Sequence, residues 1–202
     1  MMSNTIKRTN TKQNRTTNTK KQNSSIEVLK VSYPETLLQS IKNNQDIKQF
    51  STIYQNAPQV TIVNAKPKLY LITMTDPDAP YGMSNTNNTK TNNTKSNSKN
   101  HTYTHWIYLQ DMRKKQKNSS TPSTILFQYA PPSPPYGIHR YQFKLYDITT
   151  ISLTTLDTLK KNINNSLDRN IDYISSINLI PIVQFQYKVN SGKSPTRTNT
   201  TI

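Results

Sequence analysis

Apolar residues in this chain fall into short runs that alternate with polar residues, and no other feature of the sequence constrains the fold as strongly. A period of two places successive side chains on opposite faces of a β-strand. Residues 152–167 instead repeat their leucines at helical spacing after Ser152, a residue type that caps helices. The chain is therefore predicted to be all-β with few short helices, as a sandwich or a related sheet. The predicted strands cover residues 26–33, 59–64, 68–76, 102–111, 124–129, 139–148 and 181–189, and residues 35–55 fit either a short helix or a loop.

The basic charge of the chain lies outside the predicted strands. The 202 residues include 26 Lys and Arg against 10 Asp and Glu, a net charge of +16. Residues 1–24 and 84–100 are low-complexity segments rich in Asn, Thr and Lys, a composition that favours disorder. We expect a disordered basic N-terminal extension over 1–24, one domain over 25–190 with a flexible insertion at 84–100, and a disordered tail over 191–202. The whole charge excess falls within residues 1–23, 85–100, 113–117 and 188–197.

Composition excludes several classes of protein. The chain has no cysteine, so it has neither a disulfide framework nor thiolate chemistry. No apolar run approaches the roughly 20 residues that span a bilayer. The polar N-terminus lacks the apolar core of a signal peptide, so we expect a cytoplasmic protein. The basic segments are spaced by Asn and Thr, and we expect only weak contact with polyanions through them.

Three ionisable residues stand near the ends of three predicted strands. Asp76 follows the last apolar residues of its strand, whereas His105 and His139 stand near the beginnings of theirs. If the first strand runs antiparallel to the other two, all three side chains meet at one edge of the core. The proline-rich loops 77–80 and 131–135 would then wall the same spot with rigid backbone.

The chemistry of such a site follows from its residue types. A carboxylate beside an imidazole stabilises the charged ring, so Asp76 should raise the pKa of a neighbouring histidine. An imidazolium, the hydroxyl of Tyr141 and loop N–H groups are good donors to a phosphate oxygen. Strict alternation puts His105 on the face of Ile107 and Leu109. We find neither a nucleophile with a specific signature nor a glycine-rich phosphate loop, so no catalysis and no cofactor are expected.

Simpler interpretations remain open for each of these features. His105 can be a satisfied core histidine, and Arg140, which alternation places on the other face, fits a structural ion pair. The run 130–135 could bind a partner domain as a polyproline segment. A metal could be held by His101, His105 and Asp76, although we expect none. The aromatic residues of the strands could stack on single-stranded nucleic acid, but the basic residues are not interleaved with them.

Three sequence blocks together resemble the phosphatidylethanolamine-binding protein family: TMTDPDAPYG, YTHWIYLQD and APPSPPYGIHRYQFKLYD. The resemblance is clear over residues 57–148 and fainter over 180–187, and the composition suggests a divergent member from a virus or another AT-rich genome. It implies an antiparallel Greek-key β-sandwich with a small anion pocket for phosphate, phosphorylated residues or phospholipid headgroups. The ligand-binding residues that it implies are Asp76, Asp78, Tyr103, His105, Pro132, His139 and Tyr141.

The expected function is noncatalytic binding of a phosphate-bearing small molecule or a phospholipid headgroup, in a monomer that regulates a partner. One alternative is a protease or kinase inhibitor that acts through a surface loop. Another is a basic adaptor for nucleic acid or a membrane surface. Two departures from the family bear on the ligand: the insertion 84–100 lies beside the pocket mouth, and the C-terminal helix that borders the pocket in animal members is expected to be missing.

Overall fold

The computed structural model describes residues 25–33, 41–47, 54–80, 82–83, 101–113 and 123–192. The expected N-terminal extension over 1–24, the insertion over 84–100 and the tail from residue 193 onward lie outside the described residues, as does much of the ambiguous 35–55 stretch. The described part is folded mostly as β-strands, which confirms the all-β prediction.

Six strands form the main sheet, in the order β2-β8-β7-β4-β5-β6. Neighbouring strands run antiparallel, except that β2 pairs with β8 in parallel and so departs from the expected antiparallel arrangement. A separate two-stranded antiparallel sheet joins β1 to β3. The strands are β1 (Val28–Ser32), β2 (Gln45–Ile47), β3 (Gln59–Val63), β4 (Leu69–Ala79), β5 (His101–Asp111), β6 (Ser123–Phe127), β7 (Ile138–Asp147) and β8 (Val183–Asn190).

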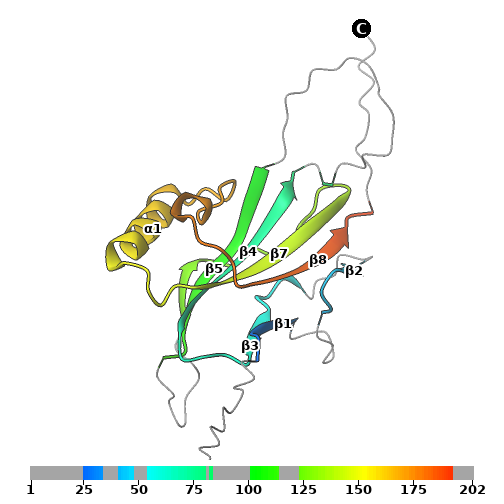
Figure 1. The fold of residues 1–202 in the computed structure, drawn as a ribbon. Helices are drawn as coiled ribbons and strands as arrows, with labels where there is room; N and C mark the ends of the chain where they lie inside the picture. Colours follow the sequence, from blue (N-terminus) through cyan, green and yellow to red (C-terminus); the bar gives the residue numbers. More distant parts are fainter. Residues whose placement is uncertain are drawn as a thin grey trace, which may run out of the picture.

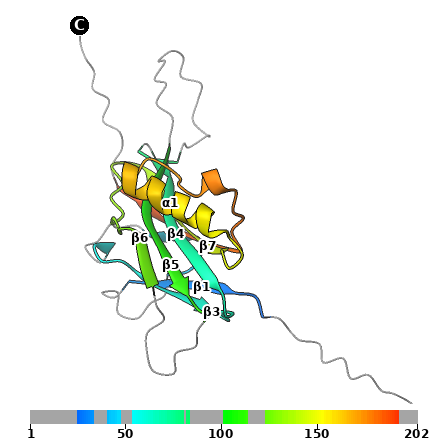
Figure 2. The ribbon, with the colours of Figure 1, turned by 90° about the vertical axis from the view of Figure 1, so that its left-hand side faces the viewer.

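The main sheet is covered on both faces. Helix α1 (Leu153–Ser166) lies over one face, and the β1–β3 pair lies over the other (Figures 1 and 2). Consequently β4, at the centre, is buried along nearly its whole length. The core towards β1 and β3 includes Leu29, Val31, Ile62, Tyr70, Ile72, Met74, Trp106, Tyr108, Tyr141, Phe143 and Tyr187. The core towards α1 includes Leu71, Ile107, Leu109, Phe127, Tyr146, Leu156, Leu159 and Ile163.

Helix α1 confirms the helical pattern read from its leucines. The Ser152 side chain caps it by accepting a hydrogen bond from the Thr155 N–H at 3.1 Å, and a left-handed residue, Leu167, ends it. Three of its apolar side chains are buried and contribute about 1.5–3 kcal/mol each: Leu156, Leu159 and Ile163. The short 3-10 helix η2 (Ser175–Ile177) follows. Within the described ranges, no helix combines the length and the apolarity needed to cross a bilayer.

The directions of three strands set the position of the site. β4 runs antiparallel to both β5 and β7, so the end of β4 meets the beginnings of the other two, as expected from the sequence. However, β4 does not end at Asp76 but continues to Ala79. The strand accommodates Pro77 because its register with β5 shifts between Asp76 and Ala79, which marks a β-bulge.

Candidate functional site

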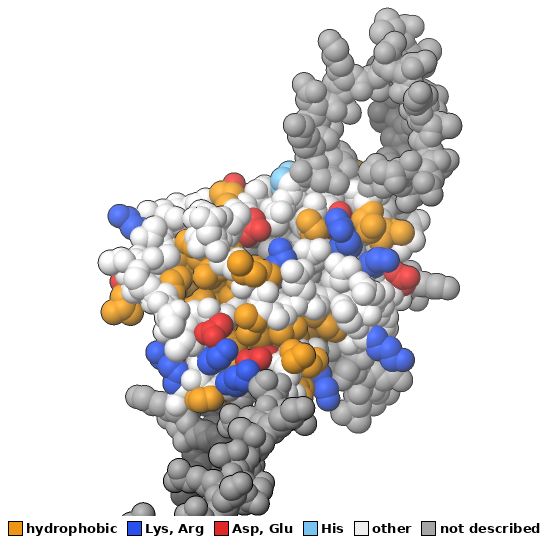
Figure 3. Space-filling model, viewed as in Figure 1, with side chains coloured by type: hydrophobic (Ala, Val, Ile, Leu, Met, Phe, Trp, Pro, Cys, Tyr) orange, Lys and Arg blue, Asp and Glu red, His pale blue; other side chains and the backbone are white. Residues whose placement is uncertain are grey.

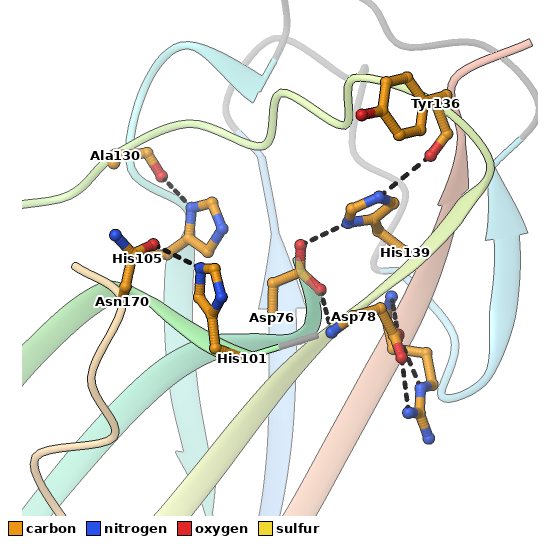
Figure 4. Close-up of polar contacts among 9 residues, drawn as sticks. Asp76, Asp78, His101, His105, Ala130, Tyr136, His139 and Asn170 are labelled. Atoms are coloured by element: carbon orange, nitrogen blue, oxygen red, sulfur yellow. Dashed lines mark hydrogen bonds and ion pairs between the residues drawn. The ribbon is translucent and has the colours of Figure 1, made fainter. Parts of the chain in front are cut away.

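A cavity of about 250 Å³ opens where β4 ends and β5 and β7 begin. Strands β4, β5 and β7 supply its walls, together with the proline-rich segment before β7 and Asn170 after α1 (Figure 4). Its lining residues are Asp76, Ala79, Pro80, His101, Tyr103, His105, Pro131, Ser133, Pro134, Pro135, His139, Tyr141 and Asn170. Five of the seven residues expected from the sequence therefore surround one hollow, and Asp78 and Pro132 are not among its lining residues.

A β-bulge in β5 is what turns His105 towards the cavity. Met74 pairs with Trp106, yet the next residue of β4, Thr75, pairs with Thr104, so the intervening His105 has no partner in the register. Its ring contacts that of Tyr141 at 5.1 Å between centroids, on the face of the β1–β3 core. Ile107 belongs to the opposite core, towards α1. The expectation from strict alternation, that His105 shares the face of Ile107 and Leu109, is therefore wrong.

His139 on β7 lies between two hydrogen-bond acceptors. Its Nδ1 is 2.6 Å from Oδ2 of Asp76, and its Nε2 is 3.1 Å from the carbonyl oxygen of Tyr136 (Figure 4). A ring whose two nitrogens both face acceptors must donate from both, and only the imidazolium can do so. The second oxygen of Asp76, Oδ1, accepts the Asp78 N–H at 2.8 Å, which holds the carboxylate in place.

The pKa of His139 reflects these contacts. Burial disfavours the charged ring and lowers the pKa, but the hydrogen bond and the negative charge of Asp76 outweigh burial, and the pKa is raised above its ordinary value. The side chains of both residues are almost completely buried, 1% and 4% exposed. The sequence expectation that Asp76 raises the pKa of a neighbouring histidine therefore holds for His139.

His105 on β5 has the opposite character. Its Nδ1 lies 2.8 Å from the carbonyl oxygen of Ala130, so Nδ1 carries the proton and donates it, and Nε2 is the bare nitrogen of a neutral ring. Burial is the largest influence and lowers the pKa of His105 to about 4. The hydrogen bond to Ala130 and the charge of Asp76 oppose this shift without cancelling it, while nearby Arg169 and His139 add to it.

Two tyrosines flank His105. Tyr141 is buried, and burial raises the pKa of its hydroxyl, although a hydrogen bond from the Ser133 backbone acts in the opposite direction. Among the described residues, the Tyr141 hydroxyl donates no hydrogen bond, so its hydrogen remains available for an acceptor on a ligand. Tyr103 is half-buried, and its ring lies 4.7 Å from that of His105 at a tilted angle. The cavity thus has aromatic walls around a few polar atoms.

Asp78, the second acid of the Asp-Pro-Asp motif, pairs with Arg140. Its carboxylate accepts from Nε and Nη2 of Arg140 at 2.8 and 2.7 Å, and from the Arg140 backbone N–H at 3.0 Å. This fork geometry is the strong form of an arginine–carboxylate pair. The structure thus gives Arg140 the ion-pair position expected of it, and Asp78 fixes the end of β4 to β7 beside the cavity.

Prolines form part of the rim, as expected, although not every proline of the two loops takes part. Pro80, Pro131, Pro134 and Pro135 line the cavity, whereas Pro132 is buried and is not among the lining residues. Among the described residues, the cis peptide bond is Ala79–Pro80.

Sequence reasoning did not assign His101 and Asn170 to the ligand site, and it missed Arg169. His101 Nε2 lies 2.7 Å from Oδ1 of Asn170 at the rim. Arg169 donates to the carbonyl oxygens of Thr104, His105 and Gln128 at 3.1–3.3 Å, and so fixes the bulge of β5 from behind. His101 could have been predicted from the sequence, because residues 101, 103 and 105 are spaced two apart on one strand. No local pattern marks Arg169 or Asn170, whose partners lie 41 to 69 positions away in the sequence.

Side chains suited to a metal ion do not gather in the described part of the chain: no group of three or more His, Asp or Glu residues is arranged to bind one. His101, which had been weighed as a ligand with His105 and Asp76, is engaged with Asn170. Besides His101, the cavity offers the imidazolium of His139, the neutral imidazole of His105 and the hydroxyls of Tyr103 and Tyr141.

Known proteins resemble this chain in sequence and in fold. The profile of the family described as phosphatidylethanolamine-binding protein matches residues 38–173, more than half of the chain. The phosphatidylethanolamine-binding protein of Plasmodium vivax has a similar fold, with a TM-score of 0.50 and 14% identity over 82% of this chain and 85% of that one. The Plasmodium falciparum protein gives a TM-score of 0.48 and 14% identity over 81% and 85% of the two chains.

A carboxypeptidase Y inhibitor, solved with its cognate proteinase, gives a TM-score of 0.48 and 19% identity over 82% of this chain and 83% of that one. The P. vivax likeness supports the fold, and the profile match extends from the segment before β2 to the loop beyond α1, across the whole cavity. On this ground, the chain belongs to the phosphatidylethanolamine-binding protein family.

Proposed function

We propose that this protein is a noncatalytic, regulatory binding protein whose cavity takes a small anionic group: phosphate, a phosphorylated ligand or a phospholipid headgroup. The observation that carries the proposal is the convergence of Asp76, His105, His139 and Tyr141 from three strands on one hollow. A mostly apolar cleft with a few convergent polar groups and shifted pKa values is the usual form of a ligand site.

The size and polarity of the cavity support a small ligand. A volume of about 250 Å³ suits a headgroup or a small ester and is below the usual range for drug-sized ligands. His139 provides a positive charge beside the negative charge of Asp76, and the hydroxyl of Tyr141 can donate to an oxygen of the ligand. The rigid proline rim lowers the entropy lost when a ligand is held.

The same lining favours binding over catalysis. Of the described residues around the cavity, Ser133 alone carries an aliphatic hydroxyl, and no hydrogen bond joins that hydroxyl to His105 or His139. A serine nucleophile needs a base within hydrogen-bond reach. Since His139 donates from both nitrogens, it is not free to accept a proton.

A titration of the full chain with inorganic phosphate tests the proposal, with the histidine ring signals followed by NMR. Phosphate should shift the signals of His105 and His139, and the effect should weaken as the pH rises through the raised pKa of His139, since the ring is charged below that pKa. Tyr141→Phe removes one donor and keeps the ring, so affinity should fall by about 10-fold or more, as for a hydrogen bond to a charged group.

Lys144→Gln is the matched control, because Lys144 lies on the same strand with its side chain on the opposite face, away from the cavity. It removes a positive charge, so any loss of nonspecific attraction would appear in this variant. Lys144→Gln should bind phosphate like the unaltered chain. The anion site is rejected if phosphate leaves both histidine signals unchanged, or if Tyr141→Phe binds phosphate as tightly as Lys144→Gln does.

Other parts of the proposal concern partners and surroundings. We propose a cytoplasmic monomer that regulates a protein partner such as a kinase or a protease, with weak polyanion contact through its basic segments. On the face seen in Figure 3, Lys and Arg side chains are interspersed with Asp and Glu. That distribution gives no support to a nucleic-acid or membrane adaptor acting through this face of the folded part.

A further inference from the structure

His105 and His139, the two buried histidines of the cavity, offer a ligand one acceptor and no free donor. Both nitrogens of His139 are already committed, to Asp76 and to the Tyr136 carbonyl. His105 commits its Nδ1 hydrogen to the Ala130 carbonyl, so the nitrogen left for a ligand, Nε2, carries a lone pair. A fully deprotonated phosphate oxygen facing this nitrogen would place two acceptors against each other.

The charges around the cavity also disfavour a doubly charged phosphate. Of the described residues that line the cavity, none is a lysine or an arginine, and the positive charge of His139 is already opposed by Asp76. Arg140 is likewise paired with Asp78. A dianion would therefore enter without a matching positive charge, which a buried site tolerates poorly. The titratable and charged groups that face His105 are Asp76 from β4, His139 and Tyr141 from β7, Tyr103 from β5 and Arg169 from behind the bulge.

A donor stands next to this acceptor. Among the described residues, no acceptor takes the hydroxyl hydrogen of Tyr141, so this hydrogen is available to a ligand. The rings of Tyr141 and His105 are in contact, with their centroids 5.1 Å apart. One donor beside one acceptor matches a group that carries both a negatively charged oxygen and a hydroxyl.

We propose, as a deepening of the proposed function and resting on it, that the cavity binds phosphate in its singly charged, hydrogen-bearing form, as in a phosphomonoester monoanion. Its P–O–H group donates to Nε2 of His105, and another of its oxygens accepts from the Tyr141 hydroxyl. A phosphodiester, including the headgroup of an intact phospholipid, has one charge but no P–O–H group. Sulfate lacks the hydrogen as well, so the site selects monoesters against both.

Calorimetric titration of the full chain with methyl phosphate, dimethyl phosphate and sulfate tests this selection. Dimethyl phosphate does not titrate between pH 5.5 and pH 8, so its affinity reports changes in the protein alone. At pH 5.5, methyl phosphate should bind at least about 10-fold tighter than either other probe, the effect of one good hydrogen bond to a charged group. Because the second pKa of a monoester is about 6, this advantage should fall by up to about 70-fold at pH 8.

The acceptor itself is tested in two ways. His105→Phe keeps a ring but removes Nε2, and should abolish the preference for methyl phosphate, whereas Lys144→Gln should retain it. Since His105→Phe also leaves the Ala130 carbonyl without its partner, the unaltered chain provides a second measurement. Its ¹⁵N ring signals should show a protonated Nδ1 and a bare Nε2 on His105, and methyl phosphate, but not dimethyl phosphate, should shift the Nε2 signal.

The outcomes separate this inference from the proposed function. Equal affinity for methyl and dimethyl phosphate at pH 5.5, or a protonated Nε2 on His105 in the free chain, overturns the inference and leaves an anion site standing. Binding of none of the three probes overturns both. A preference for methyl phosphate that follows its protonation and disappears in His105→Phe supports both.

Discussion

The β5 side and the β7 side of the cavity hold the same residue type in opposite states. His105 and His139 are both buried, and the charge of Asp76 acts on both rings. Yet the pKa of His105 is lowered to about 4, whereas that of His139 is raised. The difference lies in what each ring touches: His105 donates to a single carbonyl, and His139 lies between a carboxylate and a carbonyl.

Burial alone therefore does not decide the charge of a histidine. Desolvation is the largest influence on both rings and lowers both pKa values. A direct hydrogen bond to a carboxylate reverses it on the β7 side, while a more distant carboxylate does not on the β5 side. The consequences for stability also run in opposite directions. His139 contributes stability at low pH that is lost as the pH rises through its raised pKa, and His105 contributes stability that is lost as the pH falls.

Removing the carboxylate that sets the two sides apart should have the largest effect. Asp76→Ala leaves the buried His139 ring and the Asp78 N–H without their partner, and a broken buried ion pair costs about 3–5 kcal/mol of unfolding free energy. Urea unfolding measures the loss. Asp157→Ala is the control, since Asp157 is exposed and lies 3.8 Å from Lys160, and we expect a change below about 0.5 kcal/mol. Equal losses in the two variants would contradict the buried pair.

Acid should weaken the fold through His105. Its ordinary pKa is about 6.5 and its folded pKa is about 4. The unfolded chain therefore takes up a proton over this range that the folded chain does not, and about 3 kcal/mol of unfolding free energy is lost as the pH falls from 6.5 to 4. His105→Phe lacks this loss, so its stability should fall less between pH 7 and pH 4 in urea unfolding. Parallel pH profiles for the two chains would show that His105 is not a neutral buried ring.

The next largest effect on stability is expected at Arg169, which contacts the β5 side of the cavity. Arg169→Met removes the donors to the Thr104, His105 and Gln128 carbonyls and should cost about 1–3 kcal/mol of unfolding free energy. It should also raise the pKa of His105, because the charge of Arg169 lowers that pKa. NMR titration of the ring measures this. Arg113→Met, on an exposed pair with Asp111, should change neither quantity, and an unchanged His105 pKa in Arg169→Met would count against the contact.

The smallest effect is expected at Arg140, next to the β7 side. Arg140→Lys replaces a two-pronged pair with Asp78 by a single contact and should cost about 1 kcal/mol of unfolding free energy. Because Asp78 does not line the cavity, the titration of His139 and the affinity for phosphate should stay nearly unchanged. A large loss of affinity would show that Asp78 takes part in ligand binding after all.

Sequence patterns predicted seven of the eight strands, the helix and the meeting of three strand ends, because period and turn chemistry are local properties. They missed β2, which lies within the 35–55 stretch where a short helix or a loop was expected. They failed at the bulge of β5: alternation assigns His105 to the face of Ile107, and one residue without a partner reverses that assignment. The family resemblance also placed Asp78 beside Asp76 among the ligand-binding residues. The register shift after Asp76 separates the two acids.

The protonation states could not be predicted from the sequence for a different reason. Two of the three acceptors that fix the histidine rings are backbone carbonyls, of Ala130 and Tyr136. Every residue carries such a carbonyl, so no residue type marks them. Arg169 and Asn170 reach the site through the chain that follows α1, and their role depends on long-range packing that no local period records.

His105, the residue of β5 without a partner in the register, also separates the stability of the fold from the binding of a ligand. On the far side of His105, both cores are built from ordinary alternating positions of β4 and β5. Deleting that one histidine would remove the register shift between Met74 and Thr75 and leave the shift between Asp76 and Ala79, so the shortened chain would lose a wall of the cavity but no residue of either core. Neither core requires the extra residue, so its persistence in a lineage would be a sign that the ligand is in use.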